Sequence, residues 1–150
     1  MAEKKRPRRT RARILETSLA LFNDAGAPRV TTADIADEMN ISPGNLYYHF
    51  RNKDEIGFEL YEAYEARVLP LYADPAGRRI DVDDLWLWLH LLFERMWEYR
   101  FLYRDLDELS SREHRLGMRM GALLRKGAAT VIELCGVMVQ PVTMRASSRE

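Results

Sequence analysis

The stretch "TTADIADEMNISPGNLYYHFRNKDEI", residues 31–56, decides the fold because three helix starts follow one another within it. Thr31 has an acid three residues later, which is the pattern of a capping box. Ser42 is a good N-cap, and Pro43 suits the first helical position, where the N–H that proline lacks would have no partner. Asn52 repeats the N-cap signal. These starts predict a two-turn helix, a second short helix and a long third one.

The first two of these helices are spaced as in a helix-turn-helix, with a turn of about four residues between them. Ala36 is small where the two helices would cross closely. Asn40 occupies the turn position that requires a left-handed backbone, which Asn tolerates well. Leu46 is apolar where the second helix would pack back on the first. The combination predicts a helix-turn-helix whose second helix is the recognition helix.

The second helix divides into an inner and an outer face. Leu46 and Phe50 are four residues apart, share a face and are assigned to the core. Tyr47 and Tyr48 therefore cannot both point inward, and an outward tyrosine hydroxyl is a natural partner of a DNA phosphate. His49 is a candidate for the same role, although a lone histidine is more often an ordinary surface or core residue.

Gly44 and Asn45 lie in the first turn of this helix. Glycine in a helix is less favourable than alanine by about 0.5–1 kcal/mol, so it implies close approach, either of another helix or of the DNA major groove. The Asn45 amide can pair with adenine, or it is simply a polar group in water. Lys53 begins the next helix, where its ammonium and the free backbone N–H groups can share a phosphate.

Charge is distributed unevenly along a chain whose formal net charge is zero. Residues 1–53 hold ten Lys/Arg and six Asp/Glu, a net charge of +4, and the remainder carries −4. Seven of the ten basic residues lie in the segment "KKRPRRTRAR", residues 4–13. A basic arm on a neutral chain indicates nucleic acid or an anionic membrane surface as its partner, with a solubilising tail as the alternative.

The rest of the chain is also predicted to be helical, so the fold is expected to be all-α with about seven helices. Residues 1–52 are expected to form the three-helix DNA-binding domain with its basic arm, 53–136 a helical bundle of ligand-binding type, and 137–150 an irregular tail. The connection at 72–81 is rich in turn residues. The expected helices span about 8–25, 32–39, 43–50, 53–69, 82–99, 100–110 and 111–136.

The helix at 82–99 is apolar nearly all round, which predicts burial. Its rings could line a pocket for an apolar or aromatic small molecule, although such a stripe is more often plain core. If the last helices of the bundle are missing, the rings would instead form an exposed association surface. The candidate ligand-binding residues are Trp86, His90, Phe93, Trp97 and Tyr103.

Other classes of protein fit poorly. The single Cys135 suits a reducing cytoplasm, and no stretch has the length and apolar character of a membrane span or signal peptide. The sequence shows no paired carboxylates in the context of a pocket, no nucleophile with its base and no metal-ligand spacing. Neither catalysis nor a cofactor nor a metal ion is therefore expected.

Residues 31–56, together with the preceding "ALFNDAGAPRVTTADIA" (20–36), resemble the signature of the TetR family of bacterial transcription factors. The resemblance implies a cytoplasmic homodimeric repressor that binds a palindromic operator in double-stranded DNA and is released by a small-molecule ligand. It also implies which residues touch DNA. Phosphates would be held by Thr32, Tyr47, His49 and Lys53. Base edges or nearby backbone would be met by Ser42, Pro43, Gly44, Asn45 and Tyr48.

The chain departs from the family pattern in two places. Asn40 replaces the usual glycine of the turn. The helices also end after about the seventh, where family members commonly have about nine, so the last two, which form the dimer's bundle, are expected to be missing. A dimer made by the Trp-rich helix is one alternative. Another is a truncated member that acts as a weak DNA-binding or protein-interaction module without ligand response.

Overall fold

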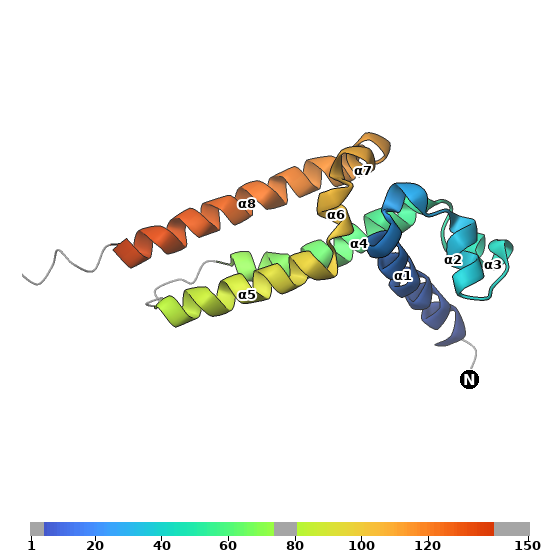
Figure 1. Cartoon of the computed structure of the whole chain (residues 1–150), viewed down its shortest axis with the longest axis horizontal. Coiled ribbons are helices and arrows are strands. Elements are labelled where there is room, and N and C mark those ends of the chain that lie inside the picture. Colours follow the sequence, from blue (N-terminus) through green and yellow to red (C-terminus); the bar gives the residue numbers. More distant parts are fainter. Residues whose placement is uncertain (1–4, 74–80, 140–150) are drawn as a thin grey trace, which may run out of the picture.

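The computed structural model describes residues 5–73 and 81–139, and within them it is all-α, without a strand. At one end of the molecule α1, α2 and α3 form a compact head (Figure 1). The long α4 leads out of this head, α5 lies beside α4, and α8 diverges from both. The bounds are α1 Lys5–Ala25, α2 Thr32–Glu38, α3 Pro43–His49, α4 Lys53–Val68, α5 Val82–Glu98, α6 Phe101–Arg104, α7 Leu106–Arg112 and α8 His114–Val139, with short 3-10 turns η1 Ala27–Arg29 and η2 Leu69–Tyr72.

The helix starts predicted in the head are confirmed. The Thr31 hydroxyl accepts a hydrogen bond from the backbone N–H of Asp34 at 3.1 Å, and the Asp34 carboxylate accepts one from the backbone N–H of Thr31 at 2.7 Å. These bonds from Thr31 lower the pKa of Asp34. Ser42 caps α3 and Asn52 caps α4 by the first of these bonds alone, since each side chain accepts from the backbone N–H three residues later. Asn40 has a φ of 54°, the left-handed conformation expected of the turn.

The second half of the chain differs from the expected layout in three ways. The single helix expected at 100–110 is two helices, α6 and α7, because the chain turns at Asp105. Its carboxylate accepts a hydrogen bond from the backbone N–H of Ala27 at 2.8 Å, which ties this turn to the head. The last helix begins at His114, since Ser110 still belongs to α7, and it continues through Gly136 to Val139. Residues 137–139 are thus helical, whereas 74–80 and 140–150 lie outside the described residues.

The head is fixed to the junction of α5 and α6 by one buried asparagine. The Asn23 amide donates to the carbonyl of Glu98 at 2.8 Å and accepts from the backbone N–H of Phe101 at 3.1 Å. The ring of Phe101 packs against that of Phe22 in α1, with 5.3 Å between centroids. Because buried polar groups need hydrogen-bond partners, Asn23 fixes how α1 meets the junction of α5 and α6, in addition to filling space there.

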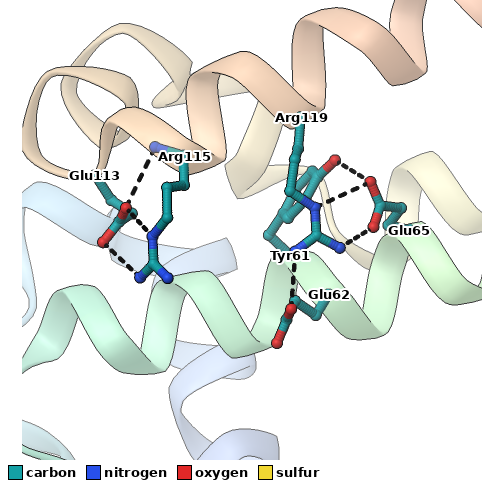
Figure 2. A network of polar contacts seen from close by, with 6 residues as sticks. All are labelled: Tyr61, Glu62, Glu65, Glu113, Arg115 and Arg119. Atoms are coloured by element: carbon teal, nitrogen blue, oxygen red, sulfur yellow. Dashed lines mark hydrogen bonds and ion pairs between the residues drawn. The ribbon is translucent and has the colours of Figure 1, made fainter.

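A polar network holds α8 against α4 (Figure 2). The Arg119 guanidinium donates to Glu62 at 2.8 Å and forms an ion pair with Glu65, whose carboxylate also accepts from the Tyr61 hydroxyl at 2.7 Å. Burial alone would raise the pKa of Glu65, but the hydrogen bonds from Arg119 and Tyr61 outweigh it, and the net pKa is lowered. Arg115, one turn earlier, pairs with Glu113 instead.

Replacing Arg119 with Gln should lower the free energy of unfolding by about 1 kcal/mol at neutral pH, since a partly exposed charged network is lost. A carboxylate whose pKa is lowered in the folded state contributes stability above its unfolded pKa, near 4.5, and loses it as the pH falls through the folded value. The difference between the variant and the wild type should therefore shrink in acid. Urea unfolding across the acid range measures it.

Arg115→Gln is the control for this substitution, because Arg115 pairs with Glu113 rather than with the acids of α4, and its side chain is 66% exposed. Its guanidinium also lies 4.6 Å from the centroid of the Phe58 ring, so its effect should be smaller than that of Arg119→Gln but not zero. An Arg119→Gln effect that stayed constant from neutral pH into acid would contradict the role given to Glu65.

Candidate nucleic-acid interface

The orientation of α3 is fixed by two buried apolar residues, one within the helix and one directly after it. Leu46 and Phe50 are 0% and 1% exposed, as the sequence predicted. On the opposite side Tyr47 is 52% exposed and Tyr48 is 79% exposed. Both tyrosines therefore point outward, which confirms the inner and outer faces of this helix.

The hydroxyls of Thr32 and Tyr47 lie 3.0 Å apart and join the start of α2 to the exposed side of α3. Both residues belong to the set predicted to hold phosphates, and the structure brings their hydroxyls together on one surface. The ring of Tyr48 meets that of His49 edge-on at 5.1 Å, and His49 is half-buried. The exposed face of α3 thus presents hydroxyl groups to solvent, while its opposite face is packed into the protein.

The first turn of α3 is open in front of Gly44. A Cβ added there would meet only the Ser42 hydroxyl, at 4.0 Å. No helix of the described residues approaches Gly44, so close packing within this chain does not explain the glycine. Pro43 and Asn45 beside it are exposed as well. The start of α3 has no bulky side chain at Gly44 and has the exposed amide of Asn45, so it can approach a DNA groove closely.

Lys53 begins α4, as expected, and its ammonium has partners within the chain. Its ammonium donates to the carbonyl of Ala27 at 2.7 Å and is 3.5 Å from that of Pro28, so it supports the turn between α1 and α2. An ammonium has three N–H donors, which leaves capacity for a phosphate. The structural contact was not foreseen, because it joins residues far apart in the sequence.

The basic segment at 4–13 is not an extended arm over the part that is described, since α1 begins at Lys5. Arg11 turns inward, where it forms an ion pair with Glu59 of α4. The side chains of Arg8, Arg9 and Arg13 are exposed. The four basic residues whose side chains are described, at positions 8, 9, 11 and 13, therefore divide into an intramolecular contact at Arg11 and three exposed side chains.

The five residues predicted to bind a ligand are not gathered around one cavity within the described residues. Trp86, His90 and Phe93 lie along an open hollow on the outer surface of α5. Trp97 is 70% exposed beneath the Arg100 guanidinium, 4.8 Å from its ring centroid. The prediction that this helix is buried all round is wrong. Its contacts with α4 and η2 cover one side only, and Leu92 is its one buried residue.

Tyr103 lies apart from the α5 rings, inside the protein. Its hydroxyl is hydrogen-bonded to that of Tyr64, and the two rings meet edge-on at 6.0 Å. Burial raises the pKa of both phenols. This tyrosine pair is part of the packing between α4 and α6 rather than the wall of an open site.

Two family models match consecutive parts of the chain. One, described as bacterial regulatory proteins of the tetR family, matches residues 14–60. The other, described as a bacterial transcriptional repressor, matches residues 63–150, more than half of the chain. The chain belongs to the TetR family.

Known bacterial regulators match less than half of the chain. The probable acrEF/envCD operon repressor of Escherichia coli K12 is 38% identical over 53 residues, which cover 35% of this chain and 24% of that protein. The transcriptional repressor KstR2 of Mycobacterium tuberculosis H37Rv is 36% identical over 64 residues, or 43% of this chain and 32% of the relative. The matched segments therefore span no more than a third of these two proteins, which are named as repressors.

A solved structure extends the likeness beyond the head. The crystal structure of a TetR-family transcriptional regulator from Marinobacter aquaeolei VT8 superposes with a TM-score of 0.82 and 39% identity, covering 86% of this chain and 64% of that one. The TetR-family fold thus includes α5 to α8 as well as the head. Within residues 5–73 and 81–139 no helix has the length and apolar character to cross a bilayer.

The turn of the helix-turn-helix gives a direct test at Asn40, where the family usually has glycine. Asn40→Gly should leave the free energy of unfolding nearly unchanged, because both residues accept a φ of 54°. Asn40→Ala should lower it by about 1 kcal/mol, since alanine is strained in a left-handed backbone. Thermal unfolding of both variants measures the difference. Equal stability of the two would contradict the turn geometry.

Proposed function

We propose that this chain is a DNA-binding transcriptional regulator, a repressor that places α3 in the major groove of its operator. The observation that supports this best is the open first turn of α3, where Gly44 has no neighbour closer than the Ser42 hydroxyl. Helix-turn-helix proteins approach base edges with the start of this helix. A regulator of this kind acts in the cytoplasm, where the bacterial chromosome lies.

The contacts follow from where the exposed groups lie. Ser42, Pro43, Gly44, Asn45 and Tyr48 would lie against base edges or the adjoining backbone. The paired hydroxyls of Thr32 and Tyr47 would bind one phosphate. His49 and the start of α4 at Lys53 would bind another, since anions bind well to free helix N-termini. Phosphate contacts would fix the register, and Asn45 would supply sequence preference.

The remaining parts of the proposal concern assembly and regulation. Residues 1–52 would be the DNA-binding domain, and the helices from residue 53 on the regulatory part. A homodimer would bind a palindromic operator with half-sites roughly 34–36 Å apart. A small apolar ligand would release the DNA by favouring a dimer in which this spacing differs. The naming of the E. coli and M. tuberculosis relatives as repressors supports repression over activation.

A second candidate is a DNA-binding or protein-interaction module that does not respond to a ligand. It is favoured by the scattering of the five candidate ligand residues over an open surface of α5 and an internal tyrosine pair. Aromatic compounds that weaken DNA binding and quench tryptophan fluorescence at matching concentrations would support the ligand-responsive regulator. DNA binding that no compound alters would favour the module.

Selecting bound duplexes from a random pool, followed by titration at several salt concentrations, tests DNA binding. The affinity should fall steeply with salt, because each phosphate contact releases counterions. Tyr47→Phe should weaken binding to all sequences alike, whereas Asn45→Ala should relax preference at one base position. Salt-independent binding, or the absence of any enriched sequence, would exclude the proposed repressor.

Gly44→Ala separates folding from DNA binding. The added methyl group meets only open space, so the free energy of unfolding should stay the same or rise by up to about 1 kcal/mol. Binding to the selected duplex should nevertheless weaken, because the methyl group would stand between α3 and the groove. Unfolding and DNA titration of the same preparation measure both effects.

Gly121→Ala is the matched control, since this glycine lies in α8 and an added Cβ would meet only the end of the Arg125 side chain at 3.4 Å. It should leave DNA binding unchanged. If Gly44→Ala bound the selected duplex as tightly as the wild type, α3 would not approach the groove by its first turn.

A further inference from the structure

One guanidinium joins α1, α3 and α4. The Arg11 side chain, near the start of α1, donates a hydrogen bond from Nη1 to the backbone carbonyl of His49, the last residue of α3. Its Nε lies 3.3 Å from one carboxylate oxygen of Glu59 in α4, and its Nη2 forms an ion pair with the other. The guanidinium also lies over the ring of Phe50, 4.0 Å from the centroid. Arg11 therefore contacts α3 and α4 at the same time.

These contacts suit arginine in particular. The last carbonyls of a helix lack partners within it and form its negative end, where a cation is favourable. The planar guanidinium can donate to the His49 carbonyl and to both oxygens of Glu59 while its face stacks on Phe50. Lysine has neither the fork nor the flat face, so it cannot replace arginine here.

The recognition helix depends on few other elements. It packs chiefly on α2, to which it is also joined by the hydroxyls of Thr32 and Tyr47. Its far end, at His49 and Phe50, is the end that Arg11 holds. An element of only seven residues held at this end should change its direction if the Arg11 contacts were lost.

We propose that Arg11 is a positioning residue, which clamps the end of the recognition helix to Glu59 of α4 and does not itself contact DNA. This inference rests on the proposed DNA-binding function and names the link that sets the direction of α3. It assigns Arg11 a role different from that of the exposed Arg8, Arg9 and Arg13, whose side chains are directed to solvent.

The Arg11 contacts also connect α4 to the recognition helix. Three acids follow one another along α4 at steps of three residues, namely Glu59, Glu62 and Glu65. Glu59 binds Arg11 of the head, and the other two bind Arg119 of α8. A displacement of α4 by events at α8 would therefore carry Glu59, Arg11 and the end of α3 with it.

The test compares full-length variants in titrations with the duplex selected from the random pool, at several salt concentrations. Arg11→Gln should weaken binding by about tenfold, with a salt dependence equal to that of the wild type, because no phosphate contact is removed. Arg13→Gln is the matched control from the same helix. Loss of a phosphate contact would instead reduce the salt slope by about one.

Glu59→Gln distinguishes the clamp most sharply. Removing a negative charge should strengthen DNA binding if Glu59 acted only through its charge. If Glu59 and Arg11 form the clamp, Glu59→Gln should instead weaken DNA binding about as much as Arg11→Gln does. The double variant should then bind DNA no more weakly than either single variant. Arg11→Lys should fail to restore binding. Far-UV circular dichroism checks that each variant is folded. If Arg11→Gln does not fold, Glu59→Gln, which preserves the shape of the side chain, still tests the clamp.

Two results would overturn the inference. One is a salt slope reduced by about one in Arg11→Gln together with unchanged or tighter binding by Glu59→Gln. Arg11 would then be a phosphate contact, and the proposed function would stand. The other is full binding by Arg11→Lys. Absence of salt-dependent binding by the wild-type chain would instead mean that the proposed function itself is wrong.

Discussion

The burial of Leu46 and Phe50 is the constraint on which the DNA-binding surface depends. Removing each of these side chains from water contributes about 1.5–3 kcal/mol, far more than any exposed contact of the same helix. With both fixed inward, a seven-residue helix has no freedom to rotate, so Tyr47 and Tyr48 must face outward. Gly44 then lies at the open start of the helix, and Arg11 stacks on the ring of Phe50 at its end.

α4 connects this surface to the rest of the chain. Its acids bind an arginine of α1 on one side and an arginine of α8 on the other. Its apolar residues Ile56, Leu60, Tyr61 and Tyr64 are buried, so the helix is held by packing as well as by charge. Because packed helices move as bodies, the two arginine contacts would couple the position of α8 to that of the head.

The sequence predicted those features that depend on neighbouring residues. The caps at Thr31 and Ser42, the left-handed Asn40 and the two faces of α3 all follow from local backbone chemistry and helical spacing. Contacts between distant segments were missed. Arg11 was one of seven basic residues in a short segment, and its only signal was a position three residues before the buried Ile14, on the same face of the helix.

The same limit explains the Trp-rich helix and the C-terminal half. Apolar residues all round α5 predicted burial, but whether neighbours cover every side of a helix depends on where distant helices lie. The break between α6 and α7 likewise depends on Asp105 meeting the backbone of Ala27, a residue of the head. The spacing of residues in the sequence does not show a contact between distant segments, so one helix was expected where the structure has two.

The most direct test of the central claim, that the outer face of α3 binds DNA, is amide chemical-shift mapping by NMR with the selected duplex. Shifts should concentrate at Thr32, in α3 from Gly44 to Tyr48 and at Lys53, while the exposed face of α5 stays unchanged. Shifts that cluster on α5 or α8 and leave the first turn of α3 unperturbed would contradict it.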